Sequence, residues 1–214
     1  MKKSILTLAT ILLVATSFGQ SEKYMNSMKQ NIAQINLLMQ NRNFTELANN
    51  FARIGDAEKD KWLPYYYAAY CTISQAYGNQ DNSNNDAIAN KATEYISKAE
   101  SILGTGNSEI NVIKSMIATA QMLADPQSRF MTYGTQSTEF LKKAKVLDPT
   151  NPRPILLEAQ NIFYTPETFG GGKDAAHPLF IEAQKLFDNF KMETDLSPDW
   201  GKQNVEYFLS QYKN

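Results

Sequence analysis

The 214-residue chain has one cysteine, Cys71, and one histidine, His177. A single cysteine excludes an internal disulfide, and Cys71 follows Tyr70 inside an apolar run, so we predict a small buried residue rather than a reactive thiol. A lone histidine has no cysteines or placed carboxylates to complete a usual zinc site, and no obvious Ser or Cys partner for a catalytic triad. We therefore predict no metal site, no cofactor and a partly exposed structural role for His177.

The sequence also lacks the motifs of the common enzyme classes. It contains no His-Glu-x-x-His or Gly-x-Ser-x-Gly, and no segment alternates as a strand does. The run Gly-Gly-Gly-Lys at 170–173 is not a phosphate-binding P-loop, because Asp174 follows the lysine and a helical segment precedes the glycines. Two interpretations stay open for it: a tight turn that folds Phe169 back onto its hairpin, or a helix start that receives a carboxylate. We predict no catalytic residues and no enzymatic activity.

Neither positive nor negative charge is in excess. The chain has 21 basic and 22 acidic residues, and its net charge is −1. Basic residues do not cluster with aromatic ones, so the sequence gives no indication of nucleic-acid binding. The polar loop at 78–86 lacks the Asp-x-Asp-x-Asp-Gly spacing of a calcium loop, so we predict a solvated connection there.

Residues 1–19 have the pattern of a targeting segment. Lys2 and Lys3 precede an apolar run at 5–14, and small residues follow up to Gly19. The run is short for a membrane span, and no cysteine near the cleavage position could take a lipid anchor. We predict cleavage after Gly19, with an uncleaved anchor as the alternative. The mature protein, 20–214, would be a single exported domain, periplasmic or secreted, with no stable membrane span.

Apolar residues recur at helical spacing along the whole mature chain. In the clearest segment, Pro152 and Pro154 suit a first helical turn, Pro166 stops that helix, and a second amphipathic helix begins near Asp174. Upstream, we expect Gly55 to end a helix and Ser108 to cap the start of another. The pattern predicts antiparallel helical hairpins over about 22–54, 62–103, 108–147 and 152–190, and a capping helix over about 199–212.

One small-large-small triad recurs in three of these hairpins. Its copies are Ala92, Ile96, Ala99; Ser137, Leu141, Ala144; and Ala176, Phe180, Ala183. Their last residues lie 45 and 39 positions apart, which is the period of stacked helix pairs. Neither helix of a pair can bury its apolar stripe alone, so we predict that the pairs stack in a row.

Ala144 with Pro149 five residues later resembles the second helix of the tetratricopeptide repeat (TPR), whose pattern is Ala-x3-Phe-x2-Ala followed by Pro. The resemblance covers about residues 62–190. The sequence departs from the family in its longer repeats, its long polar loops and its missing Trp-x2-Leu-Gly start. The resemblance implies an all-α, right-handed TPR-like superhelix with a C-terminal capping helix. The motif Tyr-x-Pro-x3-Gly-Gly-Gly-Lys-x-Ala at 164–175 also resembles periplasmic TPR-like proteins, including the helical component of TRAP-type transporters.

Residues 65–77 contain five tyrosines, which either pack the core or form a binding wall on the concave side of the superhelix. The candidate binding residues are Tyr66, Tyr70, Tyr77, Tyr164, Phe169 and Lys173. Our main hypothesis is a non-catalytic exported TPR-like scaffold that binds a protein or peptide partner. The alternative is a small-ligand-binding or transporter-accessory protein with a pocket between Tyr66, Tyr70 and the loop that runs from Tyr164 to Phe169.

Overall fold

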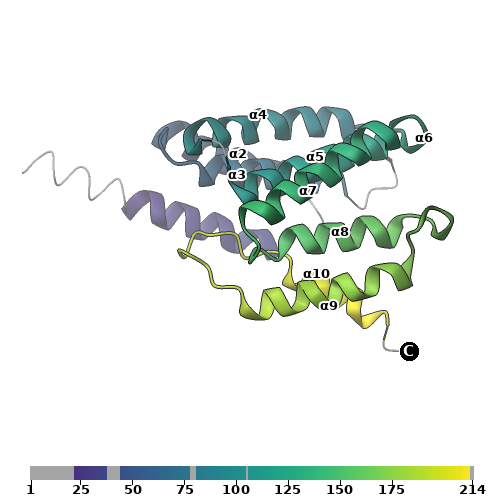
Figure 1. Ribbon diagram of the computed structural model, residues 1–214. Helices are drawn as coiled ribbons and strands as arrows, with labels where there is room; N and C mark the ends of the chain where they lie inside the picture. The colour runs from purple at the N-terminus through teal and green to yellow at the C-terminus, as the bar shows by residue number, and fades with distance from the viewer. Residues whose placement is uncertain (1–21, 38–43, 78–80, 105, 213–214) are drawn as a thin grey trace, which may run out of the picture.

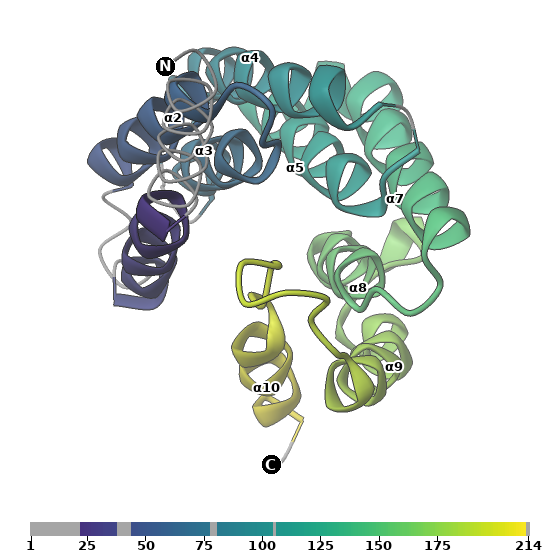
Figure 2. The ribbon, with the colours of Figure 1, turned by 90° about the vertical axis from the view of Figure 1, so that its left-hand side faces the viewer.

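The computed structural model describes residues 22–37, 44–77, 81–104 and 106–212, and the predicted targeting segment lies outside these ranges. Within them the chain is helical and contains no strand, which confirms the predicted all-α class. Successive helices run in opposite directions (Figure 1). Viewed from the side, they follow an arc whose last helix lies inside it (Figure 2).

The helices of the described ranges have the following bounds, and the turn at 38–43 of the predicted first hairpin lies outside these ranges. Residues 22–37 are helical and precede the bounded elements, which are α2 (Thr45–Glu58), α3 (Leu63–Ser74), α4 (Asn85–Leu103), α5 (Ser108–Ala124), α6 (Pro126–Arg129), the π-helix η1 (Phe130–Gly134), α7 (Thr135–Leu147), α8 (Arg153–Tyr164), the 3₁₀ turn η2 (Glu167–Phe169), α9 (Lys173–Asn189) and α10 (Lys202–Ser210). In the predicted hairpin over 108–147, a π-helical turn thus precedes the second long helix.

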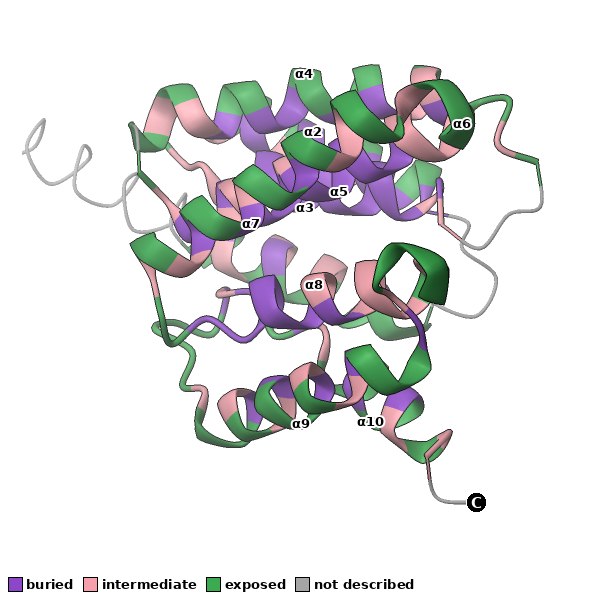
Figure 3. Ribbon diagram, turned by 45° about the vertical axis from the view of Figure 1, so that its right-hand side comes forward, coloured by how far each residue is buried: buried purple, intermediate pink, exposed green. Residues whose placement is uncertain are grey.

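The three triads occupy equivalent places in three helix pairs. They lie on α4, α7 and α9, which pack against α3, α5 and α8 respectively. No triad residue is more than 2% exposed. Buried positions line the faces where paired helices meet, and the outer faces are exposed (Figure 3). The repeated small residues therefore mark the contact face of each second helix, as the sequence pattern predicts.

Gly55 does not end its helix, contrary to the prediction. α2 continues to Glu58, and Gly55 is buried within it. A β-carbon at Gly55 would lie 2.8 Å from Cζ of Tyr65. The glycine is needed because the Tyr65 ring of α3 passes directly over it, and this contact joins two helices rather than terminating one.

Ser108 is not the N-cap of α5, contrary to the prediction. The cap is Asn107, whose side-chain oxygen accepts a hydrogen bond from the backbone N–H of Ile110 at 3.1 Å. The Ser108 hydroxyl instead donates to the backbone carbonyl of Ala144 at 2.9 Å. Ser108 therefore ties the start of α5 to the end of α7.

The described helices enclose two hydrophobic clusters. The first extends from the helix at 22–37 to Ala144 on α7, and the second lies between α8, α9 and α10. The connection from α9 to α10, residues 190–201, joins them because its Leu196 and Trp200 belong to the first cluster, whereas Val205 and Phe208 of α10 belong to the second. Because the connection packs into the first cluster up to Trp200, the final helix begins at Lys202 rather than near the predicted residue 199.

No helix in the described part of the chain is both long enough and apolar enough to cross a membrane.

Candidate functional site

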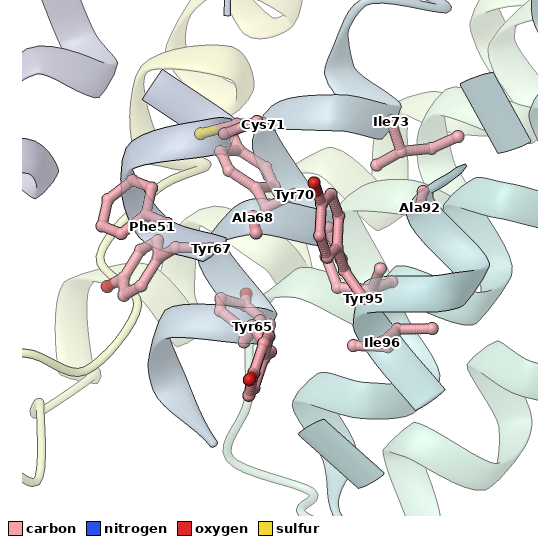
Figure 4. Close-up of a cluster of buried hydrophobic side chains, with 14 of the residues drawn as sticks. Phe51, Tyr65, Tyr67, Ala68, Tyr70, Cys71, Ile73, Ala92, Tyr95 and Ile96 are labelled. Carbon is pink, nitrogen blue, oxygen red and sulfur yellow. The ribbon is translucent and has the colours of Figure 1, made fainter. Parts of the chain in front are cut away.

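The tyrosine-rich helix α3 lies in the core. Tyr66 is 0% exposed and Tyr70 is 3% exposed. Figure 4 shows Tyr70 and its neighbours among buried apolar side chains, with the equally buried Cys71 beside them. Tyr77 is half-buried, and its hydroxyl donates to the backbone carbonyl of Met116 at 2.5 Å. Tyr66 and Tyr70 are thus buried, as the core-packing interpretation expects, and Cys71 is buried as predicted.

The chain's own 190–201 connection lies on the inside of the arc (Figure 2), and its side chains contact Tyr66 and Tyr70. The Trp200 ring stacks on Tyr70 with their centroids 4.6 Å apart. Its indole N–H donates to the Tyr66 hydroxyl at 2.9 Å, and the Tyr67 hydroxyl donates to the Leu196 carbonyl at 2.9 Å. The concave aromatic wall expected to meet a ligand therefore meets the C-terminal part of the same chain.

A buried ion pair holds this connection in place. Arg153, which is 0% exposed, donates to Oε1 of Glu109 at 2.9 Å and to the backbone carbonyl of Pro198. Its guanidinium lies 5.3 Å from the centroid of the Trp200 ring. The other carboxylate oxygen of Glu109 accepts from the Tyr66 hydroxyl at 2.6 Å. Sequence inspection missed this network, because Arg153 and Glu109 are 44 residues apart and belong to no local motif.

Burial shifts the ionisation of the tyrosines upward. Burial, with a further contribution from the neighbouring Asp56 carboxylate, raises the pKa of Tyr65 to about 12. Burial also raises the pKa of Tyr66 and of Tyr67 well above the ordinary value, and that of Cys71 likewise. These phenols and this thiol are neutral at physiological pH, so they are packing and hydrogen-bonding groups.

These shifts predict a loss of stability in alkali. An unfolded tyrosine loses its proton near 10.0, whereas folded Tyr65 keeps it to about 12. The stabilisation is therefore complete below pH 10 and is lost as the pH rises through the folded pKa. We expect the free energy of unfolding, measured by urea denaturation, to fall between pH 10 and 12, together with a delayed rise in phenolate absorbance. Unchanged stability across this interval would contradict the burial of the tyrosines.

The other predicted aromatic residues are exposed, at the end of the molecule where α8 stops. Tyr164 is 71% exposed, Phe169 is 77% exposed and Tyr207 of α10 is 62% exposed. The rings of Tyr164 and Tyr207 both contact the ring of Phe208, with centroid distances of 6.1 and 5.4 Å. We call Tyr164, Phe169, Tyr207 and Phe208 the aromatic end. Sequence inspection missed Tyr207, because α10 carries no motif.

The turn from α8 to α9 points Phe169 outward. A β-carbon at Gly171 would lie 2.3 Å from the backbone oxygen of Thr165, so the main chain folds back tightly on itself there. The Phe169 side chain does not pack back onto the hairpin, because it is 77% exposed. The interpretation in which this ring folds back is therefore wrong. Figure 3 shows the turn as an exposed projection.

Lys173, the first residue of α9, lies at the end of α10. Its ammonium donates to the backbone carbonyl of Gln211 and lies 4.9 Å from the centroid of the Tyr212 ring. The Tyr212 ring in turn stacks on His177 at 4.1 Å, and His177 is half-buried as predicted. In the described part of the chain, no group of three His, Cys, Asp or Glu side chains could hold a metal ion. This end therefore combines aromatic faces with the Lys173 ammonium and with the carboxylates of Asp174 and Glu167.

Comparisons with known proteins give one informative relative. No protein-family model and no curated protein matches the chain. Among solved structures, the HusA haemophore from Porphyromonas gingivalis superposes with a TM-score of 0.78 and has 36% sequence identity. The match covers 89% of this chain and 92% of the haemophore. The chain belongs to the protein family of the HusA haemophore.

Proposed function

We propose that this protein is an exported haem-binding protein that holds its ligand without transforming it. The 36% identity to a haemophore over 92% of that chain is the observation that supports this function best. It favours the small-ligand alternative of the sequence analysis over the protein-binding scaffold. The burial of Tyr66 and Tyr70 favours it too, because those rings were the expected peptide-binding wall.

Export and architecture are part of the same proposal. The targeting pattern at 1–19 supports secretion or a periplasmic location for a single domain from residue 20 to 214. The three equivalent triads support a TPR-like, right-handed stacking of helix pairs. In this architecture the helix pairs provide a rigid frame, and the ligand is bound by side chains at its surface or between its layers.

Titration with ferric haem (haemin) tests the function. We expect a saturable change in haem absorbance with one site per chain and a Kd of about 1 μM or tighter, corresponding to roughly −8 kcal/mol. Tryptophan fluorescence should fall in parallel, because Trp62 and Trp200 would transfer energy to bound haem. Protein unfolded in urea is the control. A change that fails to saturate, or that unfolded protein reproduces, would overturn the proposal.

A further inference from the structure

We propose that the aromatic end is the haem site, with the porphyrin face on Tyr164, Phe169 and Tyr207 and a porphyrin carboxylate on Lys173. This inference rests on the proposed function, and it assigns that function to named residues. Three observations lead to it: the exposure of the three rings, the packed rings beneath Tyr164 and Tyr207, and the Lys173 ammonium, which lies against Tyr212 after the end of α10.

The first observation is the exposure. Large aromatic rings seldom stay in water, and a contiguous exposed apolar surface marks a binding site more often than chance. Tyr164, Phe169 and Tyr207 are each more than 60% exposed and come from the end of α8, the turn after it and α10. Other exposed apolar side chains differ from these three: Val146 is 81% exposed but has no ring, and Phe130 has a ring but is only 49% exposed. A flat conjugated ligand gains most from ring faces, because aromatic pairs stack.

The second observation is the base under these rings. Phe208 is 5% exposed and stacks on the fully buried Phe180 with centroids 4.6 Å apart and planes 9° from parallel. Phe163 meets both of these rings edge-on, at 5.1 and 6.1 Å. Tyr164 and Tyr207 rest on this base through Phe208. Their contacts are therefore organised before the ligand arrives, which lowers the entropy cost of binding.

The third observation is the charge. The Lys173 ammonium is exposed and is anchored by one hydrogen bond to the Gln211 carbonyl. An ammonium has three donors, so two stay available to a carboxylate. Haem has a planar apolar ring and two carboxylate side chains at one edge, so exposed aromatic rings together with a lysine ammonium suit it. The carboxylate of Asp174 follows Lys173 directly and also acts on the Tyr212 ring, so Lys173 is the group at this helix start that a haem carboxylate would contact. The wall of Tyr66 and Tyr70 offers no comparable surface, because Trp200 covers it.

Haemin titration of two variants tests the aromatic contacts. We expect the double variant Tyr164→Ala/Phe169→Ala to weaken haemin binding by about tenfold or more, and Tyr207→Ala to weaken it by about fivefold. Phe130→Ala is the matched control, since it removes an exposed ring elsewhere and should change the Kd by less than about twofold. The replaced side chains are exposed, so circular dichroism and thermal midpoints should stay at wild-type values.

Lys173→Gln tests the carboxylate contact. We expect it to weaken binding of haemin by about fivefold and to leave binding of haemin dimethyl ester unchanged, because the ester has no carboxylate. If wild-type protein binds haemin and all aromatic-end variants bind it equally well, the site lies elsewhere and only this inference fails. If wild-type protein itself does not bind haemin, the proposed function fails.

Discussion

Replacing Trp200 with alanine is expected to lower the free energy of unfolding by about 3–5 kcal/mol, the cost of deleting a large buried aromatic side chain. Trp200 is 7% exposed, stacks on Tyr70 and donates its indole N–H to Tyr66. It is also the point at which the 190–201 connection enters the first hydrophobic cluster. Its removal leaves a cavity and removes the hydrogen bond that the Tyr66 hydroxyl accepts, although this hydroxyl still donates to Glu109. Urea denaturation followed by circular dichroism measures the loss.

Met192→Ala is the matched control for this prediction. Met192 lies in the same connection and is 48% exposed, so its truncation should change stability by no more than about 0.5 kcal/mol. A cost below about 1 kcal/mol for Trp200→Ala would mean that the connection does not hold the two clusters together.

Replacing Arg153 with methionine is expected to cost about 3–5 kcal/mol, because it leaves a largely buried carboxylate without its counter-charge. The Glu109 side chain is 13% exposed and would keep hydrogen bonds from Tyr66 and Asn151, but it would lose the guanidinium. The same denaturation experiment measures this loss. Lys142→Met, which breaks the exposed pair with Glu139, is the control and should cost no more than about 1 kcal/mol.

A double-mutant cycle separates the charge from the packing. Glu109→Gln keeps the size of the side chain and removes the negative charge, and it replaces one of the two accepting carboxylate oxygens with an NH2 group. When combined with Arg153→Met, it should recover more than about 1 kcal/mol of the sum of the single losses. Strictly additive losses would show that Arg153 acts through its contacts with Pro198 and Trp200 rather than through Glu109.

One interpretation of the tyrosine-rich run was a binding wall on the concave side of the superhelix, and the structure fills that side with the chain's own connection. Leu196 and Trp200 occupy the inside of the arc against α3. A peptide could reach Tyr66 or Tyr70 only by displacing them. Ligand binding at an exposed end of the molecule needs no such displacement, in agreement with the proposed haem site.

Local spacing in the sequence was enough to predict the helices and the faces that they bury. The triad at Ala176, Phe180 and Ala183 places its residues on one helical stripe whatever the rest of the chain does, and all three are buried. The same reasoning located the break at Pro166 and the turn before α9. The prediction that Gly55 ends a helix was wrong. In the sequence alone, a glycine that ends a helix cannot be distinguished from one that leaves room for a ring of the neighbouring helix.

The sequence by itself therefore determined the helical hairpins and their contact faces, and the tertiary structure decided which tyrosines are available. Tyr66, Tyr70 and Tyr164 all lie in predicted helical segments, yet two are buried and one is 71% exposed. The difference comes from residues far along the chain: Trp200 reaches Tyr66 across 134 positions. The spacing of apolar residues in the sequence shows only which side chains share one face of a helix. Whether a distant segment such as residues 190–201 then covers that face depends on the tertiary structure.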